Sequence, residues 1–384
     1  MINRKLRAGM VGGGIGAFIG PVHRMAATMD GEAVYVAGAF SSDPDKSRKS
    51  GEALHLDPSR VYGDYREMAE REAALSEEER IDFVSIVTPN SIHFEAAKTF
   101  LQAGFNIVCD KPMTTTLEEA RKLAAIVKET GRVFALTHNY TGYPMVKQAR
   151  HMVRSGTLGK INKVVAEYPQ GWLARLLEKG ADRESIWRMD PKKAGAGGSL
   201  GDIGTHTENL VRYITGLQIE ELCADLTSFI PGNTLDDDAS LLIRYKGGAR
   251  GVLHVSQIST GEENGINIRI YGSKLGIRWN QEEPNYLIAT HPDFQKTIYS
   301  RNNKNLCEEA LRAVRLPSGH PEGFIESHAN VYREAFRAIR AERAGEPVPA
   351  CDYPTVDDGV IGMAFIETVV ASSKSGTKWT KMIR

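Results

Sequence analysis

Two short segments of the 384-residue chain combine residue types that carry out acid–base chemistry. In the first, Lys111 directly precedes Pro112. A residue before proline is held in an extended or turn geometry, so the ammonium group can be aimed at one point. In the second segment, Asp202 and His206 are four residues apart. If a helix begins near Ser199, both lie on one face, and a carboxylate beside an imidazole favours a general base near neutral pH.

Each of these residues also has an ordinary structural interpretation. The spacing Ser199-x-x-Asp202 fits a capping box, in which the carboxylate only satisfies backbone N–H groups at a helix start. His206 alone is compatible with a packed or surface histidine, and Lys111 alone with a solvated surface lysine. The chemical interpretation therefore requires a fold that brings the two segments together.

A glycine-rich turn near the N-terminus indicates a dinucleotide site. Directly after an apolar segment, the chain reads Gly12-Gly13-Gly14-Ile15-Gly16-Ala17, which fits the pattern G-x-G-x-x-A at the end of a first strand. Such a turn lets the backbone approach a pyrophosphate. The following helix, expected after Pro21, offers free N–H groups to the phosphates. The alternative is a flexible glycine turn.

The end of the expected second strand bears on the choice between NAD and NADP. An acidic residue there normally holds the ribose 2′-hydroxyl of NAD, but the chain reads Phe40-Ser41-Ser42-Asp43. Asp43 would reach the hydroxyl from two positions further on. Alternatively, Ser41 with Lys46 or Arg48 would accept the 2′-phosphate of NADP. We expect NAD, with NADP as the alternative.

Other ligand contacts are expected at the carboxyl ends of the later parallel strands, where open α/β sheets bind ligands. The cofactor candidates there are Thr88, Pro89, Asn90, His93, Asp110, Lys111 and Asn139. For His93, packing near a helix start is the alternative. Aromatic walls and a bidentate guanidinium suit polyhydroxyl substrates, although aromatic residues more often serve the core. The substrate candidates are Tyr140, Trp172, Trp187, Arg188, Thr205 and His328, beside Lys111, Asp202 and His206.

The elements that must position these residues differ between the two parts of the chain. Up to about residue 140, apolar segments alternate with helical spacing, which is typical of a doubly wound parallel sheet. The expected strands are 6–11, 33–40, 81–88, 106–109 and 133–137, and the helical segments include 65–75, 93–103 and 117–130. This pattern predicts an N-terminal Rossmann domain over residues 1–140, in an α/β protein.

Beyond residue 140, segments that alternate with period two predict antiparallel strands. They are 161–168, 221–229, 239–245, 251–258 and 266–271, with helices expected at 205–214, 324–344 and 356–373. The segment 246–249 contains two glycines and is a plausible hairpin turn. We predict a C-terminal α+β domain over residues 141–384, with a large, mostly antiparallel open sheet.

Composition limits the kind of partner and the location. The 48 basic and 48 acidic residues balance, so no net charge favours nucleic acid or an anionic membrane. The 4 cysteines are far apart and form no metal-binding pattern, which suits a reducing compartment. No run of about 18 apolar residues predicts a membrane span, and the glycine run behind the basic N-terminus is no signal-peptide core. We expect a cytoplasmic enzyme without a metal.

Four motifs, in this order, resemble the glucose–fructose oxidoreductase / inositol dehydrogenase / rhizopine catabolism protein (Gfo/Idh/MocA) family. They are the glycine turn, Thr-Pro-Asn-x-x-His at 88–93, Asp-Lys-Pro at 110–112 and Gly-Gly…Asp-x-Gly-x-His ending at His206. The resemblance covers essentially the whole chain. It implies that Lys111, Asp202 and His206 are the catalytic trio. It also implies a substrate site on the open sheet and a homodimer or homotetramer.

Within the family, the chain is most similar to the branch of inositol, levoglucosan and glucoside dehydrogenases. Two positions depart from the family pattern. Asp110 stands where glutamate is commoner before Lys-Pro, which is a mild change. Asn209 stands where many members have an acidic residue, which puts one substrate-hydroxyl contact in doubt.

These roles predict the oxidation of a secondary hydroxyl by hydride transfer to nicotinamide. His206 takes the hydroxyl proton, Lys111 stabilises the alkoxide, and Asp202 orients His206 or shares the substrate hydroxyls. Two other classes remain open from the sequence. One is an NAD-dependent glycoside hydrolase with a tightly bound cofactor, and the other is a non-catalytic regulator that senses the cofactor.

Overall fold

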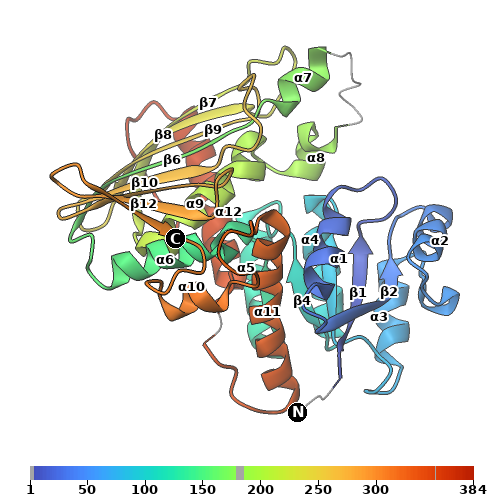
Figure 1. Cartoon of the computed structure of the whole chain (residues 1–384). Coiled ribbons are helices and arrows are strands. Elements are labelled where there is room, and N and C mark those ends of the chain that lie inside the picture. Colours follow the sequence, from blue (N-terminus) through green and yellow to red (C-terminus); the bar gives the residue numbers. More distant parts are fainter. Residues whose placement is uncertain (1–3, 179–185, 351) are drawn as a thin grey trace. The chain divides into compact units, whose positions relative to one another are not determined.

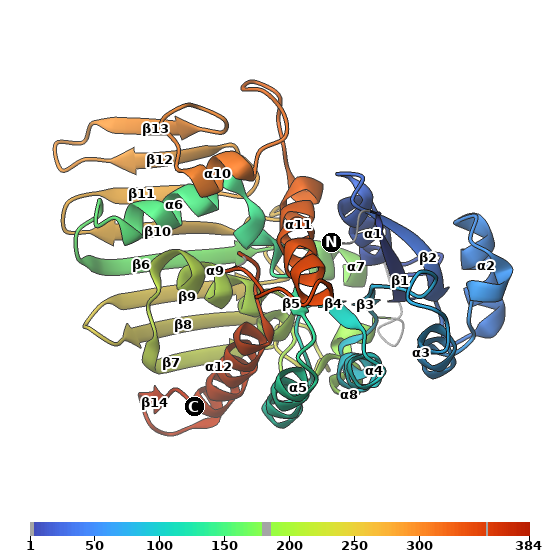
Figure 2. The ribbon, with the colours of Figure 1, turned by 90° about the horizontal axis from the view of Figure 1, so that it is seen from below.

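Apolar runs in the first 140 residues form the strands of a parallel sheet (Figure 1), in the order β2-β1-β3-β4-β5 (Figure 2). The strands are β1 (Leu6–Gly12), β2 (Ala33–Ala39), β3 (Phe83–Val87), β4 (Asn106–Cys109) and β5 (Phe134–Leu136). Every residue of β3 and β4 is buried, as expected for strands covered on both faces. The predicted Rossmann sheet is confirmed. The order reverses between β1 and β3, which is the point where such sheets bind ligands.

The computed structural model describes residues 4–178, 186–350 and 352–384, and these divide into two units. Unit 1 consists of Met1–Asn139 and Phe324–Val360, and unit 2 consists of Tyr140–Gly323 and Ile361–Arg384. The expectation that everything after residue 140 belongs to the second domain is therefore wrong for Phe324–Val360. The sequence gives no sign of this return, because a helix reads the same whichever core it joins.

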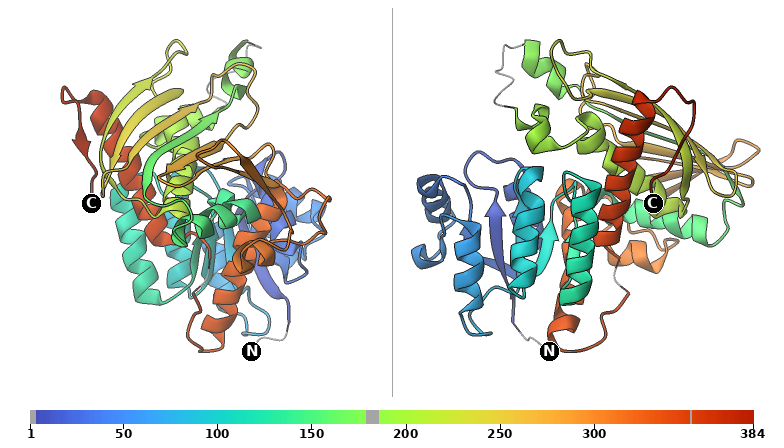
Figure 3. Two further views of the ribbon diagram at one scale, coloured as in Figure 1. Left: turned by 60° about the vertical axis from the view of Figure 1, so that its left-hand side comes forward. Right: turned by 180° about the vertical axis from the view of Figure 1, so that it is seen from behind.

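The returning segment begins with α11 (Phe324–Arg343), which completes the core of unit 1. Its residues Tyr332, Phe336 and Ile339 pack in one cluster with Leu6 and Phe83 of the parallel sheet. The other helices of this unit are α1 (Ile19–Thr28), α2 (Pro44–Ala53), α3 (Tyr65–Ala73), α4 (Asn90–Gln102) and α5 (Leu117–Thr130). From behind, α3, α4 and α5 lie side by side along the sheet (Figure 3, right).

Unit 2 is built on a nine-stranded sheet with the order β13-β12-β11-β10-β6-β9-β8-β7-β14 (Figure 2). The strands are β6 (Ile161–Pro169), β7 (Ile219–Thr227), β8 (Asp238–Tyr245), β9 (Arg250–Ser256), β10 (Asn267–Gly272), β11 (Gly276–Asn280), β12 (Tyr286–Thr290), β13 (Lys296–Ser300) and β14 (Thr380–Lys381). Among the described strands of this sheet, only β6 and β9 pair in parallel, so the predicted, mostly antiparallel sheet is confirmed. The turn 246–249 joins β8 to β9, with positive φ at Gly247 and Gly248.

One face of this sheet is covered by helices. Along β8, Ala239, Leu241 and Ile243 are buried, whereas Ser240 and Leu242 between them are exposed. The covering helices include α6 (Pro144–Arg154) and α9 (Thr205–Thr215), while α10 (Glu308–Arg312) packs on α6. The remaining helices are α7 (Trp172–Glu178), α8 (Pro191–Ala194) and α12 (Val356–Lys374), which continues from unit 1 into unit 2. In the described part of the chain, no helix is both long and apolar enough to cross a bilayer.

Candidate active site

The glycine turn after β1 provides space and donors for an anion. No side chain caps the N-terminal N–H groups of α1, and its first turn has no acidic residue. At Gly14, a Cβ atom would lie 2.9 Å from the carbonyl oxygen of Phe40, so a larger residue would displace the turn. Unpaired N–H groups at a helix start bind phosphates. The residues present therefore fit a dinucleotide pyrophosphate.

The third small residue of this motif differs from the prediction. A Cβ atom at Gly20 would lie 2.4 Å from Cα of Gly13, so the close approach of helix and turn occurs at Gly20. Ala17 lies in the preceding loop, where its N–H donates to the Gly14 carbonyl at 3.0 Å. The helix begins at Ile19, before Pro21. The role assigned to Ala17 is therefore wrong, because the loop is longer than the G-x-G-x-x-A pattern assumes.

Asp43, which was expected to reach the ribose, caps α2. Its Oδ1 accepts hydrogen bonds from the backbone N–H groups of Asp45 at 2.9 Å and Lys46 at 3.2 Å. Ser41 Oγ in turn accepts from the N–H of Asp43 at 3.1 Å. Both side chains therefore fix the start of α2, and the structure gives Asp43 a role that needs no cofactor.

His93 serves the backbone. Its Nδ1 lies 2.8 Å from the carbonyl oxygen of Pro112, and its Nε2 lies 2.9 Å from that of Thr88. Burial lowers the pKa of His93, so the neutral ring donates to one carbonyl at a time. The ring connects the end of β3 to the Lys111–Pro112 turn, whose peptide bond is cis. The structure thus supports the packed role and contradicts a cofactor contact through a ring nitrogen of His93.

Asp110 and Lys111 follow β4, at the carboxyl edge of the parallel sheet. Thr137 Oγ1 donates a hydrogen bond of 2.8 Å to Asp110 Oδ1, and His23 Nε2 lies 3.7 Å from the same oxygen. Burial opposes ionisation of Asp110, but His23 and the charge of Lys111 outweigh it and hold the pKa of this carboxyl well below its usual range. The carboxylate is therefore ionised beside the partly buried Lys111.

Two other candidates belong to the interior of unit 1. Asn139 Nδ2 donates to Ser327 Oγ at 3.2 Å, which ties the chain after β5 to α11. His328 Nδ1 donates to the Phe324 carbonyl at 3.0 Å, and its ring lies 5.7 Å from that of His23. Burial, followed by the effect of His23, lowers the pKa of His328 to about 4. His328 is therefore a neutral, internally bonded residue of the dinucleotide-binding unit.

In unit 2, Asp202 lies on η5 (Leu200–Gly204), a π-helical turn that leads into α9. Asp202 Oδ2 accepts a hydrogen bond of 2.8 Å from Gln257 Nε2 and lies 3.2 Å from Arg188 Nε. Ser199 does not cap this helix. The capping-box interpretation is therefore wrong, and the carboxylate faces side chains. Single π turns are frequent at functional sites.

The η5 turn is held by a second carboxylate, Asp236. It accepts three hydrogen bonds of 2.7 Å, from the N–H of Gly198, the hydroxyl of Ser199 and the N–H of Leu200. Burial raises the pKa of Asp236, although these donors oppose the shift. The Ser199 hydroxyl is thus a donor to Asp236, and this clamp fixes the backbone that carries Asp202.

His206 lies in the first turn of α9 and packs against two tyrosines. Its ring centroid lies 4.8 Å from that of Tyr140 and 6.3 Å from that of Tyr168. The two tyrosine hydroxyls bond to each other, and Tyr168 donates to Asn264 Oδ1 at 2.7 Å. Burial raises the pKa of both tyrosines, so their hydroxyls stay neutral. The imidazole is only 6% exposed and is held edge-on by this cluster.

The remaining substrate candidates join the same polar surroundings in unit 2. Trp172 Nε1 donates to Gln170 Oε1 at 3.1 Å, and Gln170 donates to Asn264 at 2.8 Å. Arg188 stacks on Trp187, with 4.5 Å between its guanidinium carbon and the ring centroid. These two residues lie in η4 (Trp187–Met189). Thr205 is buried and donates its hydroxyl to the Gly201 carbonyl. Trp187 therefore orients Arg188, which faces Asp202.

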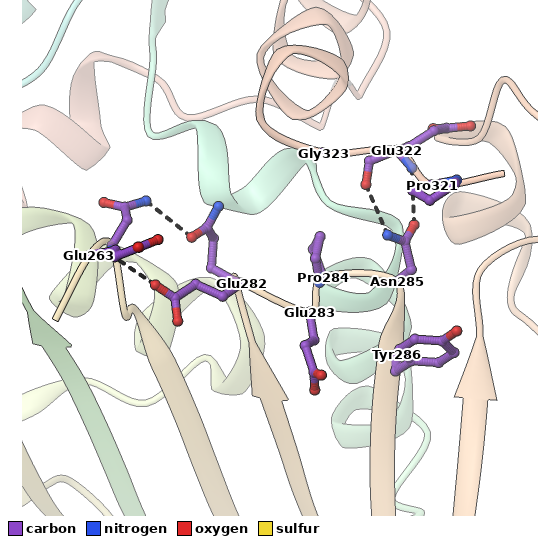
Figure 4. A pocket seen from close by; sticks show the side chains of 11 residues that line it. Glu263, Glu282, Glu283, Pro284, Asn285, Tyr286, Pro321, Glu322 and Gly323 are labelled. Carbon is purple, nitrogen blue, oxygen red and sulfur yellow. Dashed lines mark hydrogen bonds between the residues drawn. The ribbon is translucent and has the colours of Figure 1, made fainter. Parts of the chain in front are cut away.

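A pocket of about 760 Å³ adjoins this network and was not foreseen (Figure 4). It shares Asn264 and Gln281 with the network, since Asn264 Nδ2 donates to Gln281 Oε1 at 3.0 Å. The carboxylates of Glu263, Glu282 and Glu283 also line it. An acidic lining accepts hydrogen bonds from hydroxyl groups.

Sequence reasoning missed several polar residues that the structure places in these networks. They are His23, Ser85, Tyr168, Gln170, Tyr332, Asp236, Gln257 and Asn264. Gln257 directly follows β9, so the rule that strand ends carry ligands would have found it. Asn264 lies in an irregular loop, where no periodicity marks a single polar residue.

Two family models match the chain, one in each half. Residues 6–138 match the model of an oxidoreductase family with an NAD-binding Rossmann fold, and residues 146–278 match the GFO/IDH/MocA C-terminal domain. The chain is 33% identical to the uncharacterized oxidoreductase YfiI of Bacillus subtilis, over 99% of this chain and 98% of YfiI. It is 26% identical to a levoglucosan dehydrogenase of Pseudarthrobacter phenanthrenivorans, over 96% of this chain and 98% of that protein.

Solved structures lead to the same family. An inositol dehydrogenase homolog of Azotobacter vinelandii, in complex with NAD+, is 36% identical, with a TM-score of 0.95 over 99% of this chain and 98% of that one. An oxidoreductase from Sinorhizobium meliloti is 47% identical, with a TM-score of 0.88 over 99% of this chain and 100% of that one. The chain belongs to the Gfo/Idh/MocA family and is an NAD-binding oxidoreductase.

Proposed function

We propose that the protein oxidises a secondary hydroxyl group of a cyclic polyhydroxyl compound, namely an inositol, sugar, anhydrosugar or glycoside. The observation that carries this proposal is the pairing, on one helical segment, of the buried His206 with an Asp202 carboxylate that Gln257 and Arg188 hold. A hydroxyl substrate needs a base that takes its proton and several fixed donors and acceptors that orient its ring.

The residues of unit 2 supply the base and the orientation. His206 takes the proton of the reacting hydroxyl, and the edge contact with Tyr140 keeps the imidazole in place. Asp202 accepts a hydrogen bond from the reacting or a neighbouring hydroxyl. Arg188 provides a rigid set of donors suited to such ligands. The amide groups of Gln257 and Asn264 extend this polar surface.

Lys111 of unit 1 donates a hydrogen bond to the same substrate oxygen and stabilises the negative charge that develops as the proton leaves. The Asp110 carboxylate beside it balances the charge of the ammonium group. The glycine turn and the start of α1 would hold NAD, which would supply the acceptor for the hydride that leaves the carbinol carbon. The products are then a ketone, NADH and one proton.

This proposal draws support from named relatives. One is a D-glucoside 3-dehydrogenase of Escherichia coli, and another is a scyllo-inositol 2-dehydrogenase (NADP(+)) of Bacillus subtilis. A structure of the Azotobacter homolog contains NADH and myo-inositol, and its chain is 35% identical to this one. These names share a ring with several secondary hydroxyls, which is the substrate class proposed here.

The experiment is a screen for absorbance at 340 nm with inositols, hexoses, methyl glucosides and anhydrosugars, each with NAD and with NADP. We expect NAD reduction with at least one of these ring compounds. Reduction only with hydroxy acids or amino acids would contradict the substrate class. Hydrolysis of a glycoside without net NADH would contradict the proposed reaction.

A further inference from the structure

A chain of polar side chains runs through the interior of unit 1 and ends at Asp110. It begins at Tyr35 of β2, whose hydroxyl lies 2.8 Å from Ser85 Oγ of β3. Ser85 Oγ lies 2.8 Å from Tyr332 Oη of α11, and Tyr332 Oη lies 2.7 Å from Nδ1 of His23 of α1. The other nitrogen of that ring, Nε2, lies 3.7 Å from Asp110 Oδ1.

These polar side chains are enclosed in the core of unit 1. Ser85, His23 and Tyr332 are each 0% exposed, and the rings of Phe83 and Phe336 pack against Tyr332. Polar groups in such surroundings cost free energy unless they are bonded, so the three hydrogen bonds from Tyr35 to His23 favour one arrangement of their hydrogens. The ring of His328 also faces His23, and Lys111 and His93 are charged or titratable groups near enough to Asp110 to lower its pKa.

The positions of the hydrogens follow from the ionised carboxylate. An ionised Asp110 only accepts, so a His23 ring with a single proton would carry it on Nε2, the nitrogen nearer the carboxylate, and Nδ1 would be an acceptor. Tyr332 must then donate to Nδ1, Ser85 to Tyr332, and Tyr35 to Ser85. Burial raises the pKa of Tyr332 and raises that of Tyr35 to about 12, so both hydroxyls keep their protons.

Every hydrogen in the chain therefore points toward Asp110. Aligned donors polarise one another, which strengthens the last one. The 3.7 Å between His23 Nε2 and Asp110 Oδ1 exceeds a hydrogen bond, and Nε2 has no other partner among the described residues. His23 therefore acts on Asp110 through the dipole of its Nε2–H group, which points toward the negative carboxylate. The direct hydrogen bond to Asp110 Oδ1 comes from Thr137 Oγ1.

We propose that Tyr35, Ser85, Tyr332 and His23 form a positioning relay that orients the Asp110 carboxylate, and through it fixes the adjacent Lys111 for catalysis. The role of Lys111 rests on the proposed function. None of the four relay residues is assigned a contact with substrate. They act through Asp110, and this distinguishes them from the catalytic residues.

The first test is spectroscopic and needs no substrate. In protein labelled with 15N-histidine, the His23 ring, assigned with His23→Gln, is expected as the neutral tautomer with the proton on Nε2. In Tyr332→Phe, the donor to Nδ1 is gone, and the signal should move toward a mixture of tautomers. A proton on Nδ1, or a charged ring at neutral pH in the unmodified protein, would overturn the relay.

The second test is kinetic and uses a double-mutant cycle. Tyr332→Phe keeps the packed ring and should lower kcat about fivefold, since a hydrogen bond in this series contributes on the order of 1 kcal/mol, with little change in the KM for NAD. In an Asp110→Asn background, the same change should have no further effect on kcat. Additive effects of the two substitutions would contradict the relay.

Tyr62→Phe is the matched control. Tyr62 is 3% exposed in the same unit and donates to Glu72 at 2.9 Å, outside the chain that reaches Asp110. It should keep its kcat. Equal losses of kcat in Tyr62→Phe and Tyr332→Phe would show general loosening and would overturn the proposal.

If Tyr332→Phe folds poorly, a second pair of variants tests the relay at His23. His23→Gln keeps one donor and one acceptor, whereas His23→Leu keeps neither, so the first should retain several-fold higher kcat. Equal activities would contradict the relay. If the screen finds another substrate class, the same kinetic ratios are measured with that substrate. Failure of the proposed function is therefore separable from failure of the relay.

Discussion

The two candidate carboxylates, one in each unit, are held in different ways. Asp110 of unit 1 lies against a buried chain of hydroxyls and an imidazole, in which each donor is fixed by the next. Asp202 of unit 2 is partly exposed and is bonded by Gln257 and Arg188, whose side chains are long. A rigid surrounding suits the cofactor contact predicted for Asp110, since the cofactor is the same in every turnover. The surroundings of Asp202 suit hydroxyl groups that differ between substrates.

The largest effects are expected for the residues that carry the chemistry beside each carboxylate. Lys111→Ala and His206→Ala should each lower kcat by about 10² or more, because each removes charge stabilisation or proton transfer in the transition state. Lys98→Ala and His151→Ala, which alter exposed parts of α4 and α6, are the controls and should keep their activity. Near-normal turnover in both test variants would refute the assignment.

The next effect concerns stability in the region of Asp110. The pKa of His328 in the folded protein is about 4, against 6.5 in the unfolded chain. The unfolded state therefore binds more protons between these values. The contribution of the neutral His328 is complete above pH 6.5 and is lost as the pH falls toward 4, by about 3 kcal/mol in all.

Denaturant unfolding of the protein and of His328→Gln at pH 7.0 and pH 4.5 measures this contribution. The free energy of unfolding should fall less steeply with acid in His328→Gln than in the unmodified protein. The same slope in both would show that His328 is not the group responsible.

In the region of Asp202, the clamp at Asp236 should have an intermediate effect. Asp236→Asn replaces one acceptor oxygen by a donor that faces the N–H groups of η5, which should cost about 1–3 kcal/mol of unfolding free energy. It should also lower kcat/KM, because η5 carries Asp202. Asp293→Asn, at an exposed turn, is the control and should change neither. A loss of stability with unchanged kcat/KM would separate the clamp from the site.

The smallest effect is expected for Gln257, which bonds Asp202 and is proposed to adjust to different substrate hydroxyl groups. Gln257→Leu removes one hydrogen bond to the carboxylate and should raise the KM for the polyhydroxyl substrate about tenfold, with a smaller change in kcat. Gln218→Leu, at an exposed position that bonds Lys246, serves as the control. A drop in kcat with an unchanged KM would contradict this role. It would show that Gln257 positions Asp202 for the chemical step, as the side chains around Asp110 are proposed to do for Lys111.

Local patterns revealed the parts of the fold that depend on neighbouring residues in the chain. Buried parallel strands produce apolar runs, so β3 and β4 were visible, and the alternation along β8 gave its covered face. By contrast, β13 is a short edge strand that includes a lysine and three hydroxyl residues, and it was missed. The return of α11 to unit 1 was missed because its partners, such as Phe83, are distant in sequence.

The same limit applies to the site. Lys111, Asp202 and His206 stood out because their spacing has a chemical meaning. His23 and Tyr332 are 309 residues apart, and no local pattern connects them. His93, Asp43 and Ala17 fitted ligand motifs, yet the structure engages them in bonds to their own backbone. A sequence shows which groups are present, but not which of them the fold has already satisfied.

The most direct measurement is the transfer of deuterium from a ring carbon of a labelled inositol or sugar to NAD, followed by mass spectrometry of the reduced cofactor. The account predicts one deuterium in the NADH formed by the unmodified protein. It also predicts that Lys111→Ala and His206→Ala form the same labelled product about 10² times more slowly. Turnover of the substrate without label in NADH, or unchanged rates in both variants, would contradict it.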